Sequence, residues 1–310
     1  SQDCPLTIEL THFFLLQMKS TQCFWSQSIY NASLLFTVIV ALSVQCFAEV
    51  KTPAIIGDNM VLQQNHKNPI WGWAEAGESI NLSIAGQKHK TTTDSKGNWK
   101  IILNPMKAST DAKTLRINQL KYENILIGEV WLCSGQSNMG WALGNADDAD
   151  LEIMTAHYPN LRLISIPQVG TQEAKIDFKG QWEATTPEAA KNFSAVGYLF
   201  GRRLHLALGV PVGLIDNAWG GSACEAWIPR DRLNKLPVAK PYMDQWRETE
   251  KTFDYNKLLA TYEEKLKKWQ EKSQTARKEG KPQPGGRPRA PRNQLTGQHR
   301  PANLYNGVLN

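Results

Sequence analysis

Cysteine is scarce in this sequence of 310 residues, and its five cysteines form neither a CxxC pair nor a Cys/His cluster with zinc spacing. Cys4, Cys23 and Cys46 precede residue 49, in a segment that we expect to be removed. The other two, Cys133 and Cys224, are too few for a disulfide framework. We therefore expect neither a disulfide-stapled scaffold nor a structural zinc site.

The sequence also lacks a bilayer-spanning run of about 20 apolar residues and a recognisable nucleic-acid-binding module. Its net charge is +6, but the excess is local: residues 251–300 hold 13 Lys and Arg against 5 Asp and Glu. A basic excess confined to one such segment is typical of a solvated surface stretch. We expect no membrane span and no nucleic-acid partner.

The N-terminal segment has the features of an export signal. Lys19 supplies a positive charge, and residues 32–44 form an apolar stretch too short to span a bilayer. The small residues Cys46 and Ala48 predict cleavage after Ala48, with a lipid anchor at Cys46 as the alternative. We interpret residues 1–48 as an upstream extension and signal peptide of a periplasmic or secreted protein.

The stretch from residue 49 to residue 127 has the pattern of short strands. Apolar and polar residues alternate over residues 80–84 and 99–103, as in half-buried strands, and turn signals lie between them. Closely spaced strands without a helical pattern favour a β-sandwich domain over 49–127. Trp71 and Trp73 share one face of a strand, where they either pack in the core or form a platform for a sugar.

The remainder of the chain alternates between strand and helix patterns. Residues 130–133 form a short apolar run without alternation, as expected of a strand buried on both faces. Strand candidates at 161–166 and 212–215 flank a helix that should begin after Ser194 and stop at Gly209. Because strand, helix and strand follow in this order, we predict a parallel α/β sheet.

A further helix is predicted over residues 251–274, where apolar and aromatic residues follow helical spacing. The stretch 280–292, rich in Pro, Gly and Arg, predicts an exposed loop. Residues 230–298 therefore read as a helical and loop insertion within a domain that extends over 128–310.

A candidate nucleophile, Ser137, lies in Ser-Gly-Gln-Ser-Asn-Met, directly after the strand at 130–133. A catalytic serine needs exposure, a base and N–H donors for the oxyanion. The tip of a strand supplies exposure and free N–H groups, and Gly135 lets the backbone turn. Met139 replaces the second glycine of the G-x-S-x-G elbow, so this is not an α/β-hydrolase elbow. The alternative is that Ser137 caps a helix.

The stretch Asp216-Asn217-Ala218-Trp219-Gly220-Gly221-Ser222 also follows a predicted strand. Two consecutive glycines bring backbone N–H groups close to a substrate, and in open α/β sheets ligands bind at the carboxyl ends of the strands. The alternative is an ordinary turn between a strand and a helix. Two such loops at one edge of a sheet indicate a binding site more strongly than either loop alone.

Several stretches together resemble one enzyme family. Residues 128–139 (GEVWLCSGQSNM) resemble the nucleophile block of bacterial sialate O-acetylesterases, members of the SGNH (GDSL-like) hydrolase superfamily. The similarity covers most of residues 50–310. Residues 59–63 and 71–74 resemble a β-domain that precedes the catalytic domain in this family. Residues 217–222 and 225–227 resemble the family's second block, and residues 299–307 resemble a later segment.

The resemblance implies a parallel-sheet, flavodoxin-like three-layer domain behind the β-sandwich, and a Ser–His–Asp-type mechanism. Ser137 attacks an acetyl carbonyl, its own N–H and that of Gly220 or Gly221 bind the oxyanion, and water then releases acetate. Neither a metal nor an organic cofactor is implied. The residues expected to contact the substrate are Gln136, Asn138 and Trp219.

The implied substrate is O-acetylated sialic acid or a related acetylated glycan. An acetylxylan-type polysaccharide esterase is one alternative. A non-catalytic glycan-binding protein, with Trp71, Trp73, Trp131 and Trp141 as candidate platforms, is another.

The sequence departs from the family pattern in one respect. The family's Gln-Gly-Glu and Asp-x-x-His blocks are expected beyond residue 307, so the catalytic histidine and its acidic partner are missing from the sequence. We therefore expect a C-terminally truncated and nearly inactive esterase. We assign none of the histidines considered as the catalytic base; these are His66, His89, His157, His205 and His299.

Overall fold

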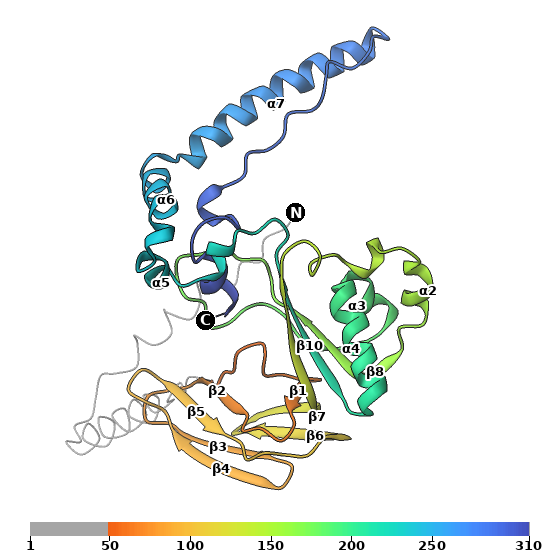
Figure 1. Ribbon diagram of the computed structural model, residues 1–310, viewed down its shortest axis with the longest axis vertical. Coiled ribbons are helices and arrows are strands. Elements are labelled where there is room, and N and C mark those ends of the chain that lie inside the picture. The colour runs from red at the N-terminus through yellow and green to blue at the C-terminus, as the bar shows by residue number, and fades with distance from the viewer. Residues whose placement is uncertain (1–48, 310) are drawn as a thin grey trace, which may run out of the picture. The chain divides into compact units, whose positions relative to one another are not determined.

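The computed structural model describes residues 49–309 (Figure 1). The predicted signal peptide and its cleavage site fall outside these residues. The strands are β1 (Val61–Gln63), β2 (Pro69–Trp73), β3 (Ser79–Ile84), β4 (Gln87–Thr92), β5 (Asn98–Ile102), β6 (Ser109–Ile117), β7 (Leu120–Gly135), β8 (Tyr158–Ser165), β9 (Glu183–Thr185) and β10 (Val212–Ala218). The α-helices are α2 (Ala149–Met154), α3 (Pro187–Asn192), α4 (Ala195–Leu208), α5 (Arg230–Asn234), α6 (Lys240–Thr252) and α7 (Tyr255–Lys278).

A mixed sheet runs through the molecule in the order β4-β3-β6-β7-β10-β8-β9, and β1 pairs with β7 beside this path. The strands β3, β4, β6 and the first part of β7 are antiparallel. The second part of β7, β10 and β8 are parallel, as the order of strand and helix in the sequence predicted. The fold is therefore mixed α/β.

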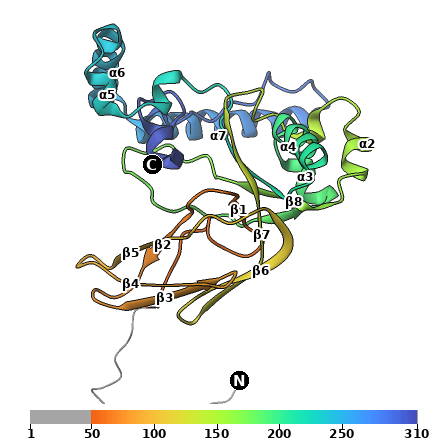
Figure 2. The same cartoon turned by 60° about the horizontal axis from the view of Figure 1, so that its bottom comes forward.

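The antiparallel region encloses an apolar core. Side chains of β3 alternate between buried and less buried positions from Ile80 to Ile84, which confirms the predicted period of two. The same core includes Ile70 of β2 and Ile101 of β5, so the separate β2–β5 pair packs against β3 (Figure 2). Trp71 is half-buried against this core, which favours a packing role for its indole.

The strand β7 connects the two regions of the sheet without a break. It runs for 16 residues from Leu120, through Gly128, to Gly135. At Gly128 the backbone passes so close to the residue before β10 that an added Cβ would lie 1.9 Å from the carbonyl oxygen of Pro211. The division into domains at 127/128 and the separate β-sandwich stay predictions, because one strand belongs to both regions.

Of the two helices between β8 and β10, α4 begins and ends as predicted. The hydroxyl of Ser194 accepts the N–H of Gly197, and Gly209 ends α4 with a φ of 66°. Ser194 satisfies one of the unpaired N–H groups of the first turn, and glycine tolerates the left-handed φ. Gly201 lets α4 approach β10, since an added Cβ would lie 2.5 Å from Leu214.

The expectation that residues 130–133 are buried on both faces is wrong. Trp131 and Leu132 are 43% and 50% exposed. Beyond Gly128, β7 pairs with β10 along one side, and no other strand within residues 49–309 pairs along its other side. The ring of Trp131 meets that of Phe200 in α4 in a T-shaped arrangement, with 5.1 Å between the ring centroids. Leu132 lies on the opposite face, so the expected third layer stays a prediction.

The predicted helix over 251–274 begins later than expected. The side chain of Asp254 accepts the N–H of Lys257 and starts α7, while residues 251–252 belong to α6. The loop after α7 runs back beside it, and Trp269 donates its indole N–H to the carbonyl of Gly285 (Figure 1). None of the helices within residues 49–309 is long and apolar enough to cross a membrane.

Candidate active site

The two loops singled out in the sequence follow neighbouring parallel strands. Gly135 at the end of β7 pairs with Ala218 at the end of β10. The N–H of Trp219, the next residue, donates to the carbonyl oxygen of Gly135 at 3.0 Å. Because parallel strands end at the same edge of a sheet, the loops that follow them meet there.

The loop of residues 136–140, which contains the candidate nucleophile Ser137 and is called the nucleophile loop below, turns sharply after β7. Gly135 has a φ of 150°, a region that only glycine adopts without strain. The N–H of Gly140 donates to the carbonyl of Gln136 at 2.8 Å and closes the loop. The side chain of Ser137 is exposed at the tip, and its N–H makes no hydrogen bond to any other described residue. Ser137 thus has the accessibility and the free donor that the sequence predicted.

The glycine loop after β10 is a four-residue turn from Trp219 to Ser222. The N–H of Ser222 donates to the carbonyl of Trp219 at 3.3 Å. Gly221, the third residue of the turn, has a φ of 71°, which glycine adopts at no steric cost. The N–H groups of Gly220 and Gly221 make no hydrogen bonds within the described part of the chain. They are free to donate to a ligand.

The two loops touch at Ser137. A Cβ added at Gly220 would lie 3.5 Å from Ser137 Oγ and 3.6 Å from Ser137 Cα. The side-chain amide of Gln136 also crosses to the glycine loop and donates to the carbonyl of Ser222 at 2.9 Å. The fold therefore places a serine hydroxyl beside a glycine turn with free N–H groups, at a distance that one added methyl group would fill.

The three residues expected to contact substrate lie around this point. Gln136 uses its amide nitrogen to join the loops, whereas Asn138 is exposed and Trp219 is half-buried. Their contact with a substrate stays a prediction. For Gln136 the structure adds a second role, because its hydrogen bond to Ser222 holds the glycine loop against the nucleophile loop.

Two titratable groups, the half-buried Asp216 and the buried Cys133, lie on the paired strands below the loops. Burial raises the pKa of the Asp216 carboxyl to about 6, against the opposing effect of the Ala218 N–H that it accepts. Burial, assisted by the charge of Asp216, raises the pKa of the Cys133 thiol to about 11. Cys133 is therefore protonated and unreactive at neutral pH. Both Cys133 and the exposed Cys224 are free thiols.

One histidine, His299, contacts the glycine loop, which the sequence did not predict. Nε2 of His299 donates to the carbonyl oxygen of Gly221 at 2.7 Å. His205, by contrast, uses Nδ1 to bond the carbonyl of Val210 at the end of its own helix. Sequence spacing carries no signal for the first contact, because His299 and Gly221 are 78 positions apart.

The segment around His299 is fixed by buried polar groups. Asn303 is fully buried and donates to the carbonyls of Leu295 and Gly297 at 3.1 and 2.8 Å. Its side-chain oxygen accepts the amide of Gln172 at 2.7 Å. The N–H of Ala302 donates to the carbonyl of Glu225 at 3.0 Å. The structure thus brings together 217–227 and 299–307, which the sequence had linked only by resemblance.

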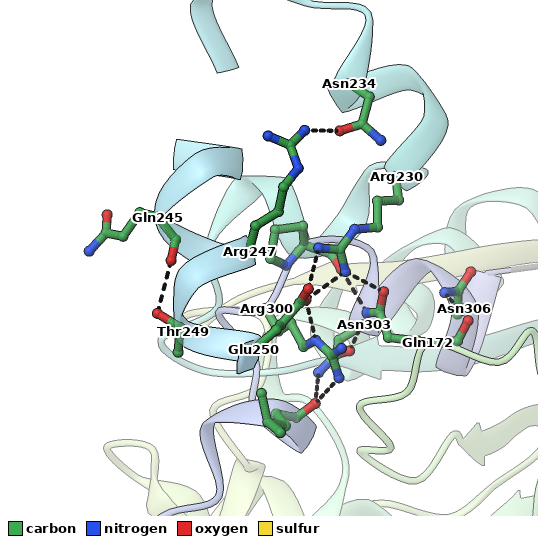
Figure 3. A network of polar contacts seen from close by, with 12 residues as sticks. Gln172, Arg230, Asn234, Gln245, Arg247, Thr249, Glu250, Arg300, Asn303 and Asn306 are labelled. Carbon is green, nitrogen blue, oxygen red and sulfur yellow. Dashed lines mark hydrogen bonds and ion pairs between the residues drawn. The ribbon is translucent and has the colours of Figure 1, made fainter. Parts of the chain in front are cut away.

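Two arginines meet on one carboxylate beside this segment (Figure 3). Arg230 binds Glu250 with both Nη atoms at 2.7 and 2.9 Å, and Arg300 binds it through Nε at 2.9 Å. Burial alone raises the pKa of Glu250, but the two arginines outweigh it, so the pKa lies below its usual value. Glu250 is therefore ionised at neutral pH and joins α6 to Arg300.

A cavity of about 810 Å³ lies elsewhere on the molecule. It is lined by residues that include Thr52, Tyr122 and Trp182, and none of its lining residues belongs to the two loops. The exposed hydroxyl of Ser137 and the free N–H groups of the two loops lie away from this cavity.

We compared the chain with known proteins by sequence and by structure. No family model matches the sequence. The chain is 34% identical to human sialate O-acetylesterase over 208 residues, which cover 60% of this chain and 40% of that protein. It is also 34% identical to the rat sialate O-acetylesterase over 207 residues, which cover 59% of this chain and 38% of the rat protein.

A solved structure is similar as well. The crystal structure of a carbohydrate acetylesterase from Xanthomonas citri matches with a TM-score of 0.57 and 33% identity, over 60% of this chain and 44% of that one. The aligned part of the chain thus spans less than half of each of these relatives. In both sequence and fold, the chain is similar to esterases that act on acetylated carbohydrates.

Proposed function

We propose that this chain carries the nucleophile and the oxyanion-binding loop of a serine esterase that removes O-acetyl groups from sialic acid or related glycans. One observation carries the proposal. The hydroxyl of Ser137 lies within van der Waals reach of a methyl group at Gly220, at the shared end of β7 and β10. Similarity to sialate O-acetylesterases and to a carbohydrate acetylesterase supports the substrate class.

The chemistry begins at Ser137. Its Oγ attacks the acetyl carbonyl, and a base accepts the hydroxyl proton as the new C–O bond forms. The carbonyl oxygen becomes an oxyanion, which accepts hydrogen bonds from the N–H of Ser137 and from that of Gly220 or Gly221. The sugar hydroxyl leaves with a proton, and an acetyl group remains on Ser137. Water then attacks this ester, releases acetate and restores the serine.

The base does not come from the described histidines in the present geometry. Within residues 49–309 no histidine bonds to Ser137, and Nε2 of His299 is engaged by Gly221. We therefore propose that the base belongs to the Asp-x-x-His block that the family resemblance implies. Where that block is absent, hydrolysis should be slow, because Ser137 then attacks without a general base.

The test is acetate release from O-acetylated sialic acid and from acetylxylan by the purified chain. Ser137→Ala should abolish the hydrolysis above background, because the nucleophile is lost. Ser165→Ala is the matched control, since Ser165 is an exposed serine at the end of the neighbouring parallel strand β8. Equal rates for the wild type and Ser137→Ala would rule out the proposal. Faster release from acetylxylan would replace sialic acid by a plant polysaccharide as the substrate.

A further inference from the structure

The glycine loop is held from outside the sheet by two consecutive residues of the segment around His299. Nε2 of His299 donates to the carbonyl of Gly221 at 2.7 Å. The carbonyl of Gln298 accepts the N–H of Ala223 at 3.1 Å. The loop from Gly221 to Ala223 therefore has a hydrogen bond at each end. On its other side, Gln136 holds the carbonyl of Ser222.

Such restraint matters at this turn because glycine has the widest choice of backbone angles. Gly220 and Gly221 together leave four soft torsions that no side chain restricts. The direction of their N–H groups depends on those torsions, and oxyanion donors act only when they are already aimed at the developing charge. A hydrogen bond to the carbonyl of Gly221 removes part of this freedom before substrate arrives.

His299 is itself fixed by the helix α6. The hydroxyl of Tyr242 donates to the carbonyl oxygen of His299 at 2.7 Å. Two turns further along the same helix, Glu250 binds Arg300, the residue after His299 (Figure 3). Glu250 is in turn held by both Nη atoms of Arg230. Helix α6 thus holds the backbone of His299 and the side chain of its neighbour.

We propose that His299 is a positioning residue for the oxyanion loop, and that α6 sets its place through Tyr242 and Glu250. The proposal rests on the proposed esterase function. It gives the inserted segment that contains α6 a task in catalysis, although it carries none of the reacting groups. His299 acts through the backbone of Gly221 and not on the substrate.

The experiment compares His299→Ala with His299→Gln in the full chain. Hydrolysis of p-nitrophenyl acetate should show a fall in kcat of about 10-fold for His299→Ala, with KM within about 2-fold, because a misaimed donor costs less than a deleted one. His299→Gln retains an N–H donor on a side chain of similar reach, so it should restore most of kcat. Tyr242→Phe, which removes only one hydroxyl, should lower kcat by about 2-fold to 5-fold.

His89→Ala is the control, because the ring of His89 bonds the side chain of Gln87 on β4 and belongs to neither loop. It should match the wild type. The proposal is overturned if His299→Ala keeps the wild-type kcat, or if His299→Gln is as slow as His299→Ala.

Ser137→Ala, measured in parallel, separates the two claims. If the wild type shows no hydrolysis that depends on Ser137, the esterase proposal fails, and amide exchange of residues 219–223 decides the positioning claim alone. Exchange there should speed up at least 5-fold in His299→Ala and stay near the wild-type rate in His299→Gln. Unchanged exchange in His299→Ala would overturn the claim.

Discussion

The antiparallel region and the region around the candidate site are stabilised in different ways. In the first, a single apolar core includes Ile70, Ile80, Ile101 and Ile117, and buried area supplies the stability. In the second, residues 217–230 and 293–307 are joined by individual hydrogen bonds, such as that of His299 to Gly221. Within 293–307 the fully buried Asn303 bonds two backbone carbonyls. The stability gained from apolar burial is the sum of many small contacts, so it varies little with the exact position of any one atom. A hydrogen bond, by contrast, is lost when its donor or its acceptor is removed.

The largest expected effect is in the apolar core. Ile117→Ala on β6 removes a fully buried side chain and should lower the free energy of unfolding by about 2–5 kcal/mol. Ile102→Ala on β5 is the matched control, because Ile102 is 43% exposed and should cost less than about 1 kcal/mol. Urea unfolding measures both. Similar losses for the two variants would contradict the view that burial in this core dominates the region.

The next effect tests the polar region. Asn303→Ala leaves the carbonyl of Gly297 without its side-chain donor, removes one of the two side-chain donors to Leu295, and should cost about 1–3 kcal/mol. Hydrogen exchange should rise first in residues 293–303, while the strand β3 keeps its protection. Asn256→Ala, at an exposed position on α7, is the control and should change neither. A uniform rise in exchange across both regions would show that they are not stabilised separately.

The smallest effect depends on pH and concerns Asp216, between the two regions. Its folded pKa of about 6 lies above the value of about 3.9 in an unfolded chain. The folded state therefore retains the proton longer, and stability falls as pH rises from about 4 through 6. Asp216→Asn removes this cost, and its side-chain oxygen still accepts the Ala218 N–H.

Asp216→Asn should therefore stabilise the protein by about 1–2 kcal/mol at pH 8, with little change at pH 4, since partial exposure reduces the full effect of the shift. Thermal melting at the two pH values measures the difference. A gain that is equal at both values would mean that the effect does not come from ionisation of Asp216.

The contrast between the regions also explains what could be read from the sequence. The strand β3 and the helix α4 were predicted because alternation and capping residues are local patterns that Ile80–Ile84, Ser194 and Gly209 display directly. The exposure of Leu132 was missed, because an apolar run does not reveal which neighbouring strands are present. Local sequence patterns therefore predict where a strand or helix begins and ends better than they predict which other strands and helices pack against it.

The candidate site shows the same division. Ser137 and Gly220 were identified from loops after predicted strands, and the pairing of β7 with β10 brings them together. The contact of His299 with Gly221 could not be predicted, because it depends on how a distant segment folds back. Polar contacts between segments far apart follow no period and leave no pattern in a single sequence.

The continuity of β7 has a consequence for modularity. One strand contributes Ile125 to the apolar core and, ten residues later, Gly135 to the loop that presents Ser137. Detaching the antiparallel region would cut β7 in two, so recombination could not transfer either part with all of its strands intact. In a heating experiment the two parts should melt in a single calorimetric peak, and a mechanical load on either should be transmitted along β7 to the other.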